Sequence, residues 1–350
     1  MARSLRDKVV VITGASSGIG RATSLAFAAK GARLVVAARR EHPLETLVTE
    51  CRRLGVEALA VPTDVTHEAD LESLARQAEE RFGGIDVWIN NAGVYMVGRF
   101  EDTPPDAFRR LIETNVFGVV SGTRAALPHL RRRQGVLVNT ASVDSAVAMP
   151  YFSAYVASKW AVRGFTNAIR QEYLDAVQVC AVLSAGIDIP LFQHAANYTG
   201  RAMKAINPTY TPEMVADAMI RCAEHGTREV TVGGAGSLMK LQYTFFPALA
   251  ERLLPKQIDA DHFVPGESAP STDGNVYKPM AEGTGTSGGW GGGHADRIGG
   301  AALAGIAVAG SAVAWFATRG SRNGHAGRIP VPFRRRQSGM QKLIRTLGAA

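Results

Sequence analysis

An apolar run followed by a glycine-rich turn, near the start of the chain, limits the folds open to it. Residues 9–12 are three valines and an isoleucine, a composition typical of a buried parallel strand. The turn that follows has the pattern G-x-x-x-G-x-G, with Gly14, Gly18 and Gly20, and helical composition continues over 21–30. A strand, a tight glycine turn and a helix N-terminus bring free backbone N–H groups to one point, which favours a bound phosphate. The pattern predicts a dinucleotide-binding α/β fold.

The rest of the first 260 residues alternates short apolar runs with segments of helical periodicity. We expect strands at 33–38, 58–62, 85–89, 135–140, 177–183 and 229–232, and helices at 71–82, 155–169 and 212–225. Alternation of this kind predicts a doubly wound parallel sheet. No repeat of the solenoid type is found.

Tyr155 and Lys159 are four residues apart in a predicted helix, so both side chains lie on one face. A nearby ammonium group lowers the pKa of a tyrosine, which makes its hydroxyl usable as a general acid or base. This spacing is also common in ordinary amphipathic helices. Ser142, at the exit of a predicted strand, adds a third polar group.

The glycine pattern, Ser142 and the Tyr155–Lys159 pair together resemble the short-chain dehydrogenase/reductase family, over about residues 5–255 and with a C-terminal extension. The resemblance implies a single Rossmann-type domain that transfers a hydride between a nicotinamide cofactor and a carbonyl or alcohol group. It implies that Tyr155 donates the proton and Ser142 binds the same oxygen. Lys159 then lowers the Tyr155 pKa and holds the nicotinamide ribose. Asn115 matches the family's fourth catalytic residue, and an asparagine in mid-helix also suggests a local irregularity.

The resemblance also implies a cofactor site. Its contacts are expected from the glycine-rich turn, three strand ends and the predicted helix: Gly14, Ser16, Ser17, Gly18, Ile19, Gly20, Arg39, Asp64, Val65, Asn91, Ala92, Gly93, Tyr155, Lys159 and Gly186. Residues 90–93 have a mainly structural role in the family. After the sixth strand this chain has Ser184-Ala185-Gly186 in place of the usual Pro-Gly pair, and Ile189 in place of a threonine. The residues expected to seat the nicotinamide therefore depart from the family pattern.

The end of the second predicted strand favours NADP(H). NAD enzymes of this kind place an acidic residue there, which binds the ribose 2′-hydroxyl. This chain has Ala38 followed by Arg39 and Arg40. Guanidinium groups bind a 2′-phosphate through bidentate hydrogen bonds. The alternative is that both arginines are solvated surface residues.

The formal net charge of +8 comes from the end of the chain. Residues 319–350 carry eight Lys and Arg and no acidic residue, while the remainder holds equal numbers of basic and acidic residues. A nucleic-acid groove on the main domain is therefore not expected. The separated Cys51, Cys180 and Cys222 give neither a disulfide framework nor a metal-binding pattern, and no metal site is expected.

The composition changes after about residue 260. We expect a catalytic domain over 1–260, a Gly/Pro/Ser-rich linker over 261–297, an Ala/Gly-rich apolar segment over 298–318 and a basic tail over 319–350. The uncharged apolar segment is long enough to span a bilayer. A single crossing would separate the arginine-rich tail from the domain that needs cytosolic NADP(H). Attachment to the cytoplasmic face of a membrane is therefore predicted, with collapse onto the domain as the alternative.

The sequence thus predicts an NADP(H)-dependent oxidoreductase acting on an apolar carbonyl or alcohol. Residues 191–211 stand where the family has its variable substrate lid, and His194 within them is interpreted as a bystander. A cytoplasmic location is expected, since the N-terminus leaves no room for a signal peptide. A homo-oligomer is also expected. Two alternatives stay open. One is a non-catalytic NADP(H)-binding regulatory or docking protein that acts through its tail. The other is an enzyme whose tail docks on nucleic acid or protein.

Overall fold

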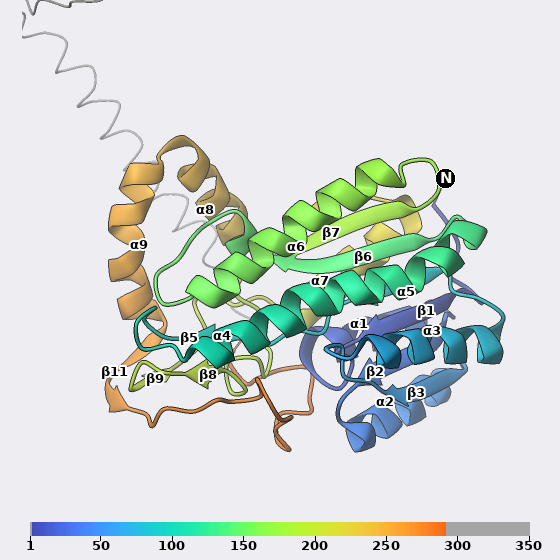
Figure 1. Ribbon diagram of the computed structural model, residues 1–350, viewed down its shortest axis with the longest axis horizontal. Coiled ribbons are helices and arrows are strands. Elements are labelled where there is room, and N and C mark those ends of the chain that lie inside the picture. Colours follow the sequence, from blue (N-terminus) through green and yellow to red (C-terminus); the bar gives the residue numbers. More distant parts are fainter. Residues whose placement is uncertain (1, 292–350) are drawn as a thin grey trace, which may run out of the picture. The chain divides into compact units, whose positions relative to one another are not determined.

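Figure 1 shows the computed structural model of the chain, in which residues 2–291 are described. The predicted apolar segment at 298–318, the basic tail at 319–350 and the end of the predicted linker lie outside this range. No helix within 2–291 has both the length and the apolar composition needed to cross a lipid bilayer.

Seven parallel strands form the central sheet, in the order β10-β7-β6-β4-β1-β2-β3. They are β1 (Val9–Thr13), β2 (Arg33–Ala38), β3 (Ala58–Pro62), β4 (Val87–Asn90), β6 (Val136–Ser142), β7 (Gln178–Ser184) and β10 (Glu229–Val232). The chain adds β2 and β3 on one side of β1, and then β4, β6, β7 and β10 on the other. The direction of growth therefore reverses between β1 and β4, where ligands bind in folds of this class. The predicted doubly wound parallel sheet is confirmed.

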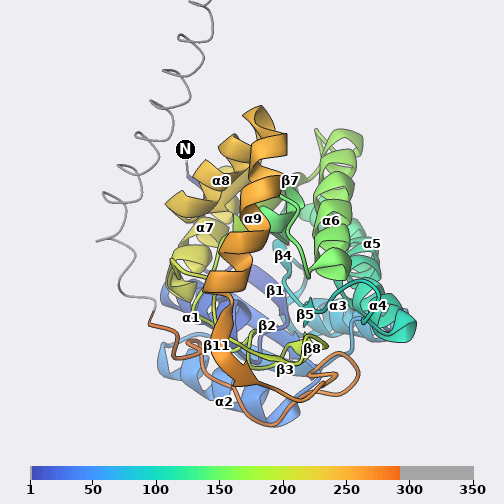
Figure 2. The same cartoon turned by 90° about the vertical axis from the view of Figure 1, so that its left-hand side faces the viewer.

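Helices cover both faces of the sheet (Figure 2). The helices are α1 (Gly18–Ala29), α2 (Glu41–Arg53), α3 (Glu68–Phe82), α4 (Pro105–Ile112), α5 (Gly118–Arg133), α6 (Ser153–Glu172), α7 (Pro212–His225), α8 (Gly234–Phe245) and α9 (Pro247–Asp261). One core joins the sheet to α1, α2 and α7, and a second joins its other face to α3 and α5. In β1, Val10 and Ile12 belong to the first core, and Val9 and Val11 to the second. A continuous apolar run is required because successive side chains enter opposite cores.

A π-helical turn at Glu113–Phe117 joins α4 to α5. Asn115 lies at its centre and is 1% exposed. Single π-turns inside helices commonly occur at functional sites. The irregularity predicted from the mid-helix asparagine is confirmed.

Two short strand pairs lie outside the main sheet: β5 (Met96–Val97) with β8 (Ala196–Asn197), and β9 (Arg201–Met203) with β11 (Phe263–Ser268). The sequence did not predict these pairs, nor α8 and α9. The composition of 261–297 predicted a linker, but its described part, up to residue 291, packs on the domain. After β11, residues 272–290, which we call the strap, run along the carboxyl ends of the strands and hydrogen-bond there.

Two glycine substitutions test how closely the glycine-rich turn is packed. A Cβ at Gly20 would lie 2.3 Å from the Gly14 carbonyl oxygen, whereas one at the exposed Gly164 of α6 would meet nothing within 4 Å. We expect Gly20→Ala to lower the free energy of unfolding by about 1–3 kcal/mol, because backbone must move. Gly164→Ala should raise it by about 0.5–1 kcal/mol, because alanine favours the helix. Urea unfolding measures both, and equal effects would contradict this packing.

Candidate active site

The glycine-rich turn connects β1 to α1 at the reversal point of the sheet. Gly14 and Gly18 have φ of +68° and +54°, which side chains rarely adopt, and a Cβ on Gly14 would lie 2.7 Å from Ala92 Cα. The first turn of α1 has no acidic residue, and Ser17 makes no side-chain cap. The helix N-terminus thus offers N–H donors that its own side chains leave for another acceptor. Ser16 and Ile19 are buried beside it. These residues fit a dinucleotide pyrophosphate.

Asn91, just after β4, fixes the position of this turn. Its Nδ2 donates to the carbonyl oxygens of Thr13 (3.1 Å) and Gly14 (3.3 Å). The Thr13 hydroxyl in turn accepts from the backbone N–H groups of Asn91 and Ala92, at 3.0 and 3.2 Å. The ends of β1 and β4 are therefore tied together, which agrees with the structural role expected for residues 90–93.

The structure brings Ser142, Tyr155 and Lys159 together. Ser142 ends β6, and the other two lie on one face of α6. The Lys159 Nζ lies 5.5 Å from the centre of the Tyr155 ring and donates to the Thr140 carbonyl at 3.0 Å. All three side chains are buried. The shared helix face predicted from the four-residue spacing is present.

The pKa of Tyr155 differs from the expectation drawn from that spacing. Burial raises it, the Asp144 carboxylate raises it further, and the hydrogen bond from Ser142 lowers it only in part. The pKa of Lys159 is lowered to about 8, because burial outweighs the attraction of Asp144. Loss of hydration is the dominant influence on both groups. Tyr155 therefore holds its proton in this site.

Asn115 hydrogen-bonds both α6 and the segment after β4. Its Oδ1 accepts from the Val94 N–H at 2.8 Å, and its Nδ2 donates to the Val94 carbonyl (3.0 Å) and to the Ser158 hydroxyl (3.1 Å). A Cβ at Gly93 would lie 3.3 Å from Asn115 Oδ1 and 3.9 Å from Lys159 Nζ. The π-turn thus places Asn115 beside Lys159, with its side chain committed to structural hydrogen bonds.

Asp144 is a carboxyl in this site that the sequence interpretation missed. The Asp144 Oδ2 accepts from the Ser142 hydroxyl at 3.2 Å. The backbone N–H of Asp144 donates to the Ser142 hydroxyl oxygen at 3.1 Å. Burial raises its pKa to about 6, against the Ser142 hydrogen bond and the Lys159 charge, which lower it. Its place two residues after Ser142 was the only signal in the sequence.

Aromatic rings line the other side of Tyr155. Tyr95 packs edge-on against Tyr155 with ring centres 4.7 Å apart, and it also contacts Phe152, Phe192 and His262. Burial lowers the pKa of His262 to about 4, so this imidazole is neutral at pH 7. Phe192 comes from the predicted lid and His262 from the segment just after α9. The resulting surroundings of the tyrosine are apolar and aromatic.

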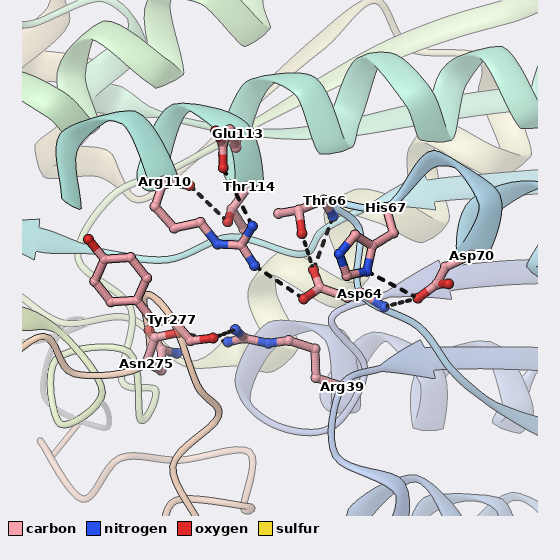
Figure 3. Close-up of polar contacts among 10 residues, drawn as sticks. All are labelled: Arg39, Asp64, Thr66, His67, Asp70, Arg110, Glu113, Thr114, Asn275 and Tyr277. Carbon is pink, nitrogen blue, oxygen red and sulfur yellow. Dashed lines mark hydrogen bonds and ion pairs between the residues drawn. The ribbon is translucent and has the colours of Figure 1, made fainter. Parts of the chain in front are cut away.

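Arg39 and Arg40 directly follow β2, and Figure 3 shows Arg39 beside Asn275. Arg39 donates to the strap carbonyl of Asn275 at 2.7 Å, and Arg40 reaches the hydroxyls of Ser16 (3.2 Å) and Ser17 (3.1 Å). Neither guanidinium is simply a solvated surface group. No carboxylate occupies position 38.

Asp64, after β3, faces Arg110 of α4 at 3.3 Å (Figure 3). Although burial raises the Asp64 pKa, the Thr66 hydrogen bonds and the charges of Arg110 and Arg39 hold it below its usual value. Val65 beside it is buried, and a Cβ on Gly118 would lie 2.8 Å from Val65 Cγ2. Both residues thus lie where the third strand meets the start of α5.

The turn after β7 packs closely although it lacks the Pro-Gly pair. A Cβ on Gly186 would lie 2.6 Å from the Ile206 carbonyl oxygen, and the Gly186 carbonyl accepts from the Tyr210 N–H at 2.8 Å. Ile189 contacts the glycine-rich turn, since a Cβ on Gly18 would lie 3.2 Å from Ile189 Cβ.

His194 is 6% exposed, with its Nε2 3.0 Å from the Glu282 carbonyl oxygen of the strap. Asp188, which the sequence interpretation also missed, binds the strap as well.

Within residues 2–291, no group of three or more His, Cys, Asp or Glu side chains is arranged to hold a metal ion. The three cysteines are free and buried, and Cys180 lies in the first core.

Known proteins resemble the chain over this same region. The family model for short chain dehydrogenases matches residues 8–198. The uncharacterized oxidoreductase YxnA of Bacillus subtilis is 35% identical over 281 residues, which are 79% of this chain and 79% of that protein. The 11-beta-hydroxysteroid dehydrogenase A of Sesamum indicum is 35% identical over 64% of this chain and 68% of its own length.

A solved alcohol dehydrogenase from Thermococcus sibiricus, complexed with 5-hydroxy-NADP, superimposes with a TM-score of 0.58 and 30% identity. The superposition covers 64% of this chain and 95% of that one. Since the family model matches more than half of the chain, and YxnA resembles it over most of its length, the chain belongs to the short-chain dehydrogenase family, oxidoreductases that act on alcohol and carbonyl groups.

Proposed function

We propose that this chain reduces a carbonyl group of an apolar small molecule with NADPH, and that Ser142, Tyr155 and Lys159 carry the chemistry. The observation that supports this most is the buried cluster of the three side chains at the carboxyl end of β6. Bound nicotinamide supplies the hydride. The homo-oligomer and the attachment of the tail to the cytoplasmic face of a membrane stay predictions.

The three side chains have complementary tasks in the reductive direction. Tyr155, whose raised pKa keeps it protonated, donates its hydroxyl proton to the carbonyl oxygen. Ser142 hydrogen-bonds the same oxygen and stabilises the negative charge that develops on it. Lys159, charged below its pKa of about 8, favours the transient phenolate and holds the ribose hydroxyls. Asn115 keeps α6 in register with the segment after β4.

The charges at the end of β2 support NADP(H). Arg39 and Arg40 both reach the edge of the dinucleotide groove, and Ala38 has no carboxylate that would repel a 2′-phosphate. The Thermococcus sibiricus neighbour carries 5-hydroxy-NADP, which is consistent with this preference.

The aromatic rings beside Tyr155 support an apolar substrate. Tyr95, Phe152 and Phe192 surround Tyr155 with packed aromatic rings and few hydrogen-bonding groups. Binding in such surroundings is driven by burial of apolar surface. The sesame relative is named for a hydroxysteroid, so hydroxysteroids and their ketones form one class of compound to test.

Removing one hydroxyl tests the assigned acid. Tyr155→Phe should reduce kcat at least about a hundredfold, because general acid catalysis typically contributes that much. The Kd for NADPH should stay nearly unchanged. Tyr173→Phe, at the far end of α6, is the matched control and should keep normal turnover. NADPH oxidation with aldehydes, ketones and ketosteroids measures the rate. Near-normal turnover of Tyr155→Phe would show that another group donates the proton.

Two substitutions test the cofactor preference. Arg39→Ala should lower the NADPH-to-NADH affinity ratio by at least about tenfold, because a charge-assisted hydrogen bond is lost. Ala38→Asp should move the ratio in the same direction by repelling the 2′-phosphate. Calorimetric titration with both cofactors measures the ratio. Equal affinity of the wild-type protein for the two would contradict the proposal.

Asp144 adds a pH-dependent group to the site. Its ordinary pKa of 3.8 is raised to about 6 on folding, so the folded protein binds this proton more tightly than the unfolded chain does. The proton's contribution to stability is complete below pH 3.8 and is lost as the pH rises through about 6.

Asp144→Asn should therefore raise the free energy of unfolding at pH 7 by about 3 kcal/mol relative to its effect at pH 3.5. Urea unfolding at the two pH values gives the difference. Asp175→Asn, at an exposed carboxyl, is the matched control. An equal effect of Asp144→Asn at both pH values would mean that this carboxyl titrates normally.

A further inference from the structure

The strap follows the groove that the proposed cofactor would occupy. It is held at its start by β8, where the Asn197 N–H donates to the Thr272 carbonyl at 2.8 Å and the Thr272 N–H donates back at 3.0 Å. The Tyr198 hydroxyl donates to Asp273 at 2.7 Å. Gly274 packs so closely that a Cβ would lie 2.3 Å from the His194 carbonyl oxygen. The start of the strap is therefore anchored to the domain by residues 272–274.

The first part of the strap takes the hydrogen bonds of both arginines. Arg39 donates to the carbonyl oxygen of Asn275 (Figure 3), and Arg40 donates to those of Met280 (2.9 Å) and Glu282 (2.8 Å). These are the two guanidinium groups proposed for the 2′-phosphate. The strap supplies neutral oxygen acceptors where the cofactor would supply anionic ones.

The middle of the strap reaches the glycine-rich turn. The Gly18 N–H, at the N-terminus of α1, donates to the Gly285 carbonyl at 2.9 Å. This donor belongs to the helix end that favours a pyrophosphate. An N–H that donates to a carbonyl at this distance is not free for a phosphate oxygen.

The last part of the strap binds the turn after β7, on the side of Tyr155 and Ser142. Asp188, 7% exposed, accepts from the Ser287 hydroxyl (2.8 Å) and from the N–H groups of Gly288 (3.0 Å) and Trp290 (2.9 Å). The Trp290 indole donates to the Ile189 carbonyl at 3.2 Å. Asp188 and Ile189 thus anchor the end of the strap beside the proposed nicotinamide site.

Along the strap the contacts come in the order of a dinucleotide: the end of β2, the glycine-rich turn, and the turn after β7. We propose that residues 272–290 are an autoinhibitory segment that occupies the cofactor groove and must leave it before the dinucleotide binds. This inference rests on the proposed cofactor site. The cofactor displaces the strap because charged phosphate oxygens bind arginine more strongly than neutral carbonyls do. Its apparent affinity is reduced by the fraction of molecules in which the groove is closed.

Hydrogen–deuterium exchange of the full chain, with and without NADPH, tests both the proposed cofactor site and the inference about the strap. NADPH should slow exchange of the amides at 14–20 and speed exchange of those at 274–290. Slower or unchanged exchange in the strap, together with a protected turn, would overturn the inference and leave the proposed cofactor site intact. No change at 14–20 with either NADPH or NADH would overturn both.

Loosening the far anchor provides a second measurement. The double variant Ser287→Ala/Trp290→Ala loses two side-chain hydrogen bonds of the strap and should lower the calorimetric Kd for NADPH by about tenfold. Phe245→Ala, at an exposed aromatic residue at the end of α8, is the control and should leave the Kd unchanged. An unchanged or higher Kd in the double variant would mean that the strap closes over the cofactor, or does not affect it, and would overturn the inference.

Discussion

The close approach of two strand ends, β1 and β4, is the constraint on which the rest of this structure depends. Gly14 lies against Ala92 with no room for a side chain, and Asn91 holds the carbonyls of Thr13 and Gly14. This contact fixes where the glycine-rich turn points its N–H groups. Because β4 also pairs with β6, the same contact sets the distance between that turn and Ser142. The groups proposed for cofactor binding and for catalysis therefore share one edge of the sheet.

Burial decides the electrostatics of the site. The pKa values of Tyr155, Lys159 and Asp144 are all shifted so that the neutral form is favoured. In each case the loss of hydration on burial outweighs the effect of neighbouring charges and hydrogen bonds. The remaining attraction between Asp144 and Lys159 limits the shifts of both. A tyrosine that keeps its proton suits the donor role in carbonyl reduction. The groups suited to bind an anion lie elsewhere, at Arg39, Arg40 and the N-terminus of α1.

The strap uses the binding features of the groove without the charge of a ligand. Backbone carbonyls satisfy the arginines and one N–H at the start of α1, while Asp188 accepts the backbone N–H groups at the strap's other end. Such contacts cost the strap little desolvation free energy, because its backbone groups are neutral. It is also easier to displace than an ion pair would be. The polypeptide can therefore keep an anion-binding groove closed and still leave it responsive to a phosphate-bearing molecule.

Local pattern determined much of the protein. The valine run, the three glycines and the βα alternation predicted the parallel sheet. A continuous apolar run is typical of a strand buried on both faces, and the glycines allow the tight turn that follows it. The four-residue spacing placed Tyr155 and Lys159 on one helix face, and the mid-helix Asn115 correctly indicated an irregular turn. These features depend on neighbours within a few residues, which a sequence displays directly.

Tertiary structure decided what depends on distant partners. Burial, and not the nearby ammonium, sets the Tyr155 pKa, and the sequence does not show how deeply a group is buried. The short turn Val143–Ser145 after β6 brings the Asp144 carboxyl to Ser142, and burial in the folded domain raises the Asp144 pKa. The composition of the strap is typical of a linker, and its order comes from Arg39, Arg40, Gly18 and Asp188, which lie between 99 and 267 residues away from their partners in the strap. No local pattern encodes such a pairing, because the groove exists only once the sheet has formed.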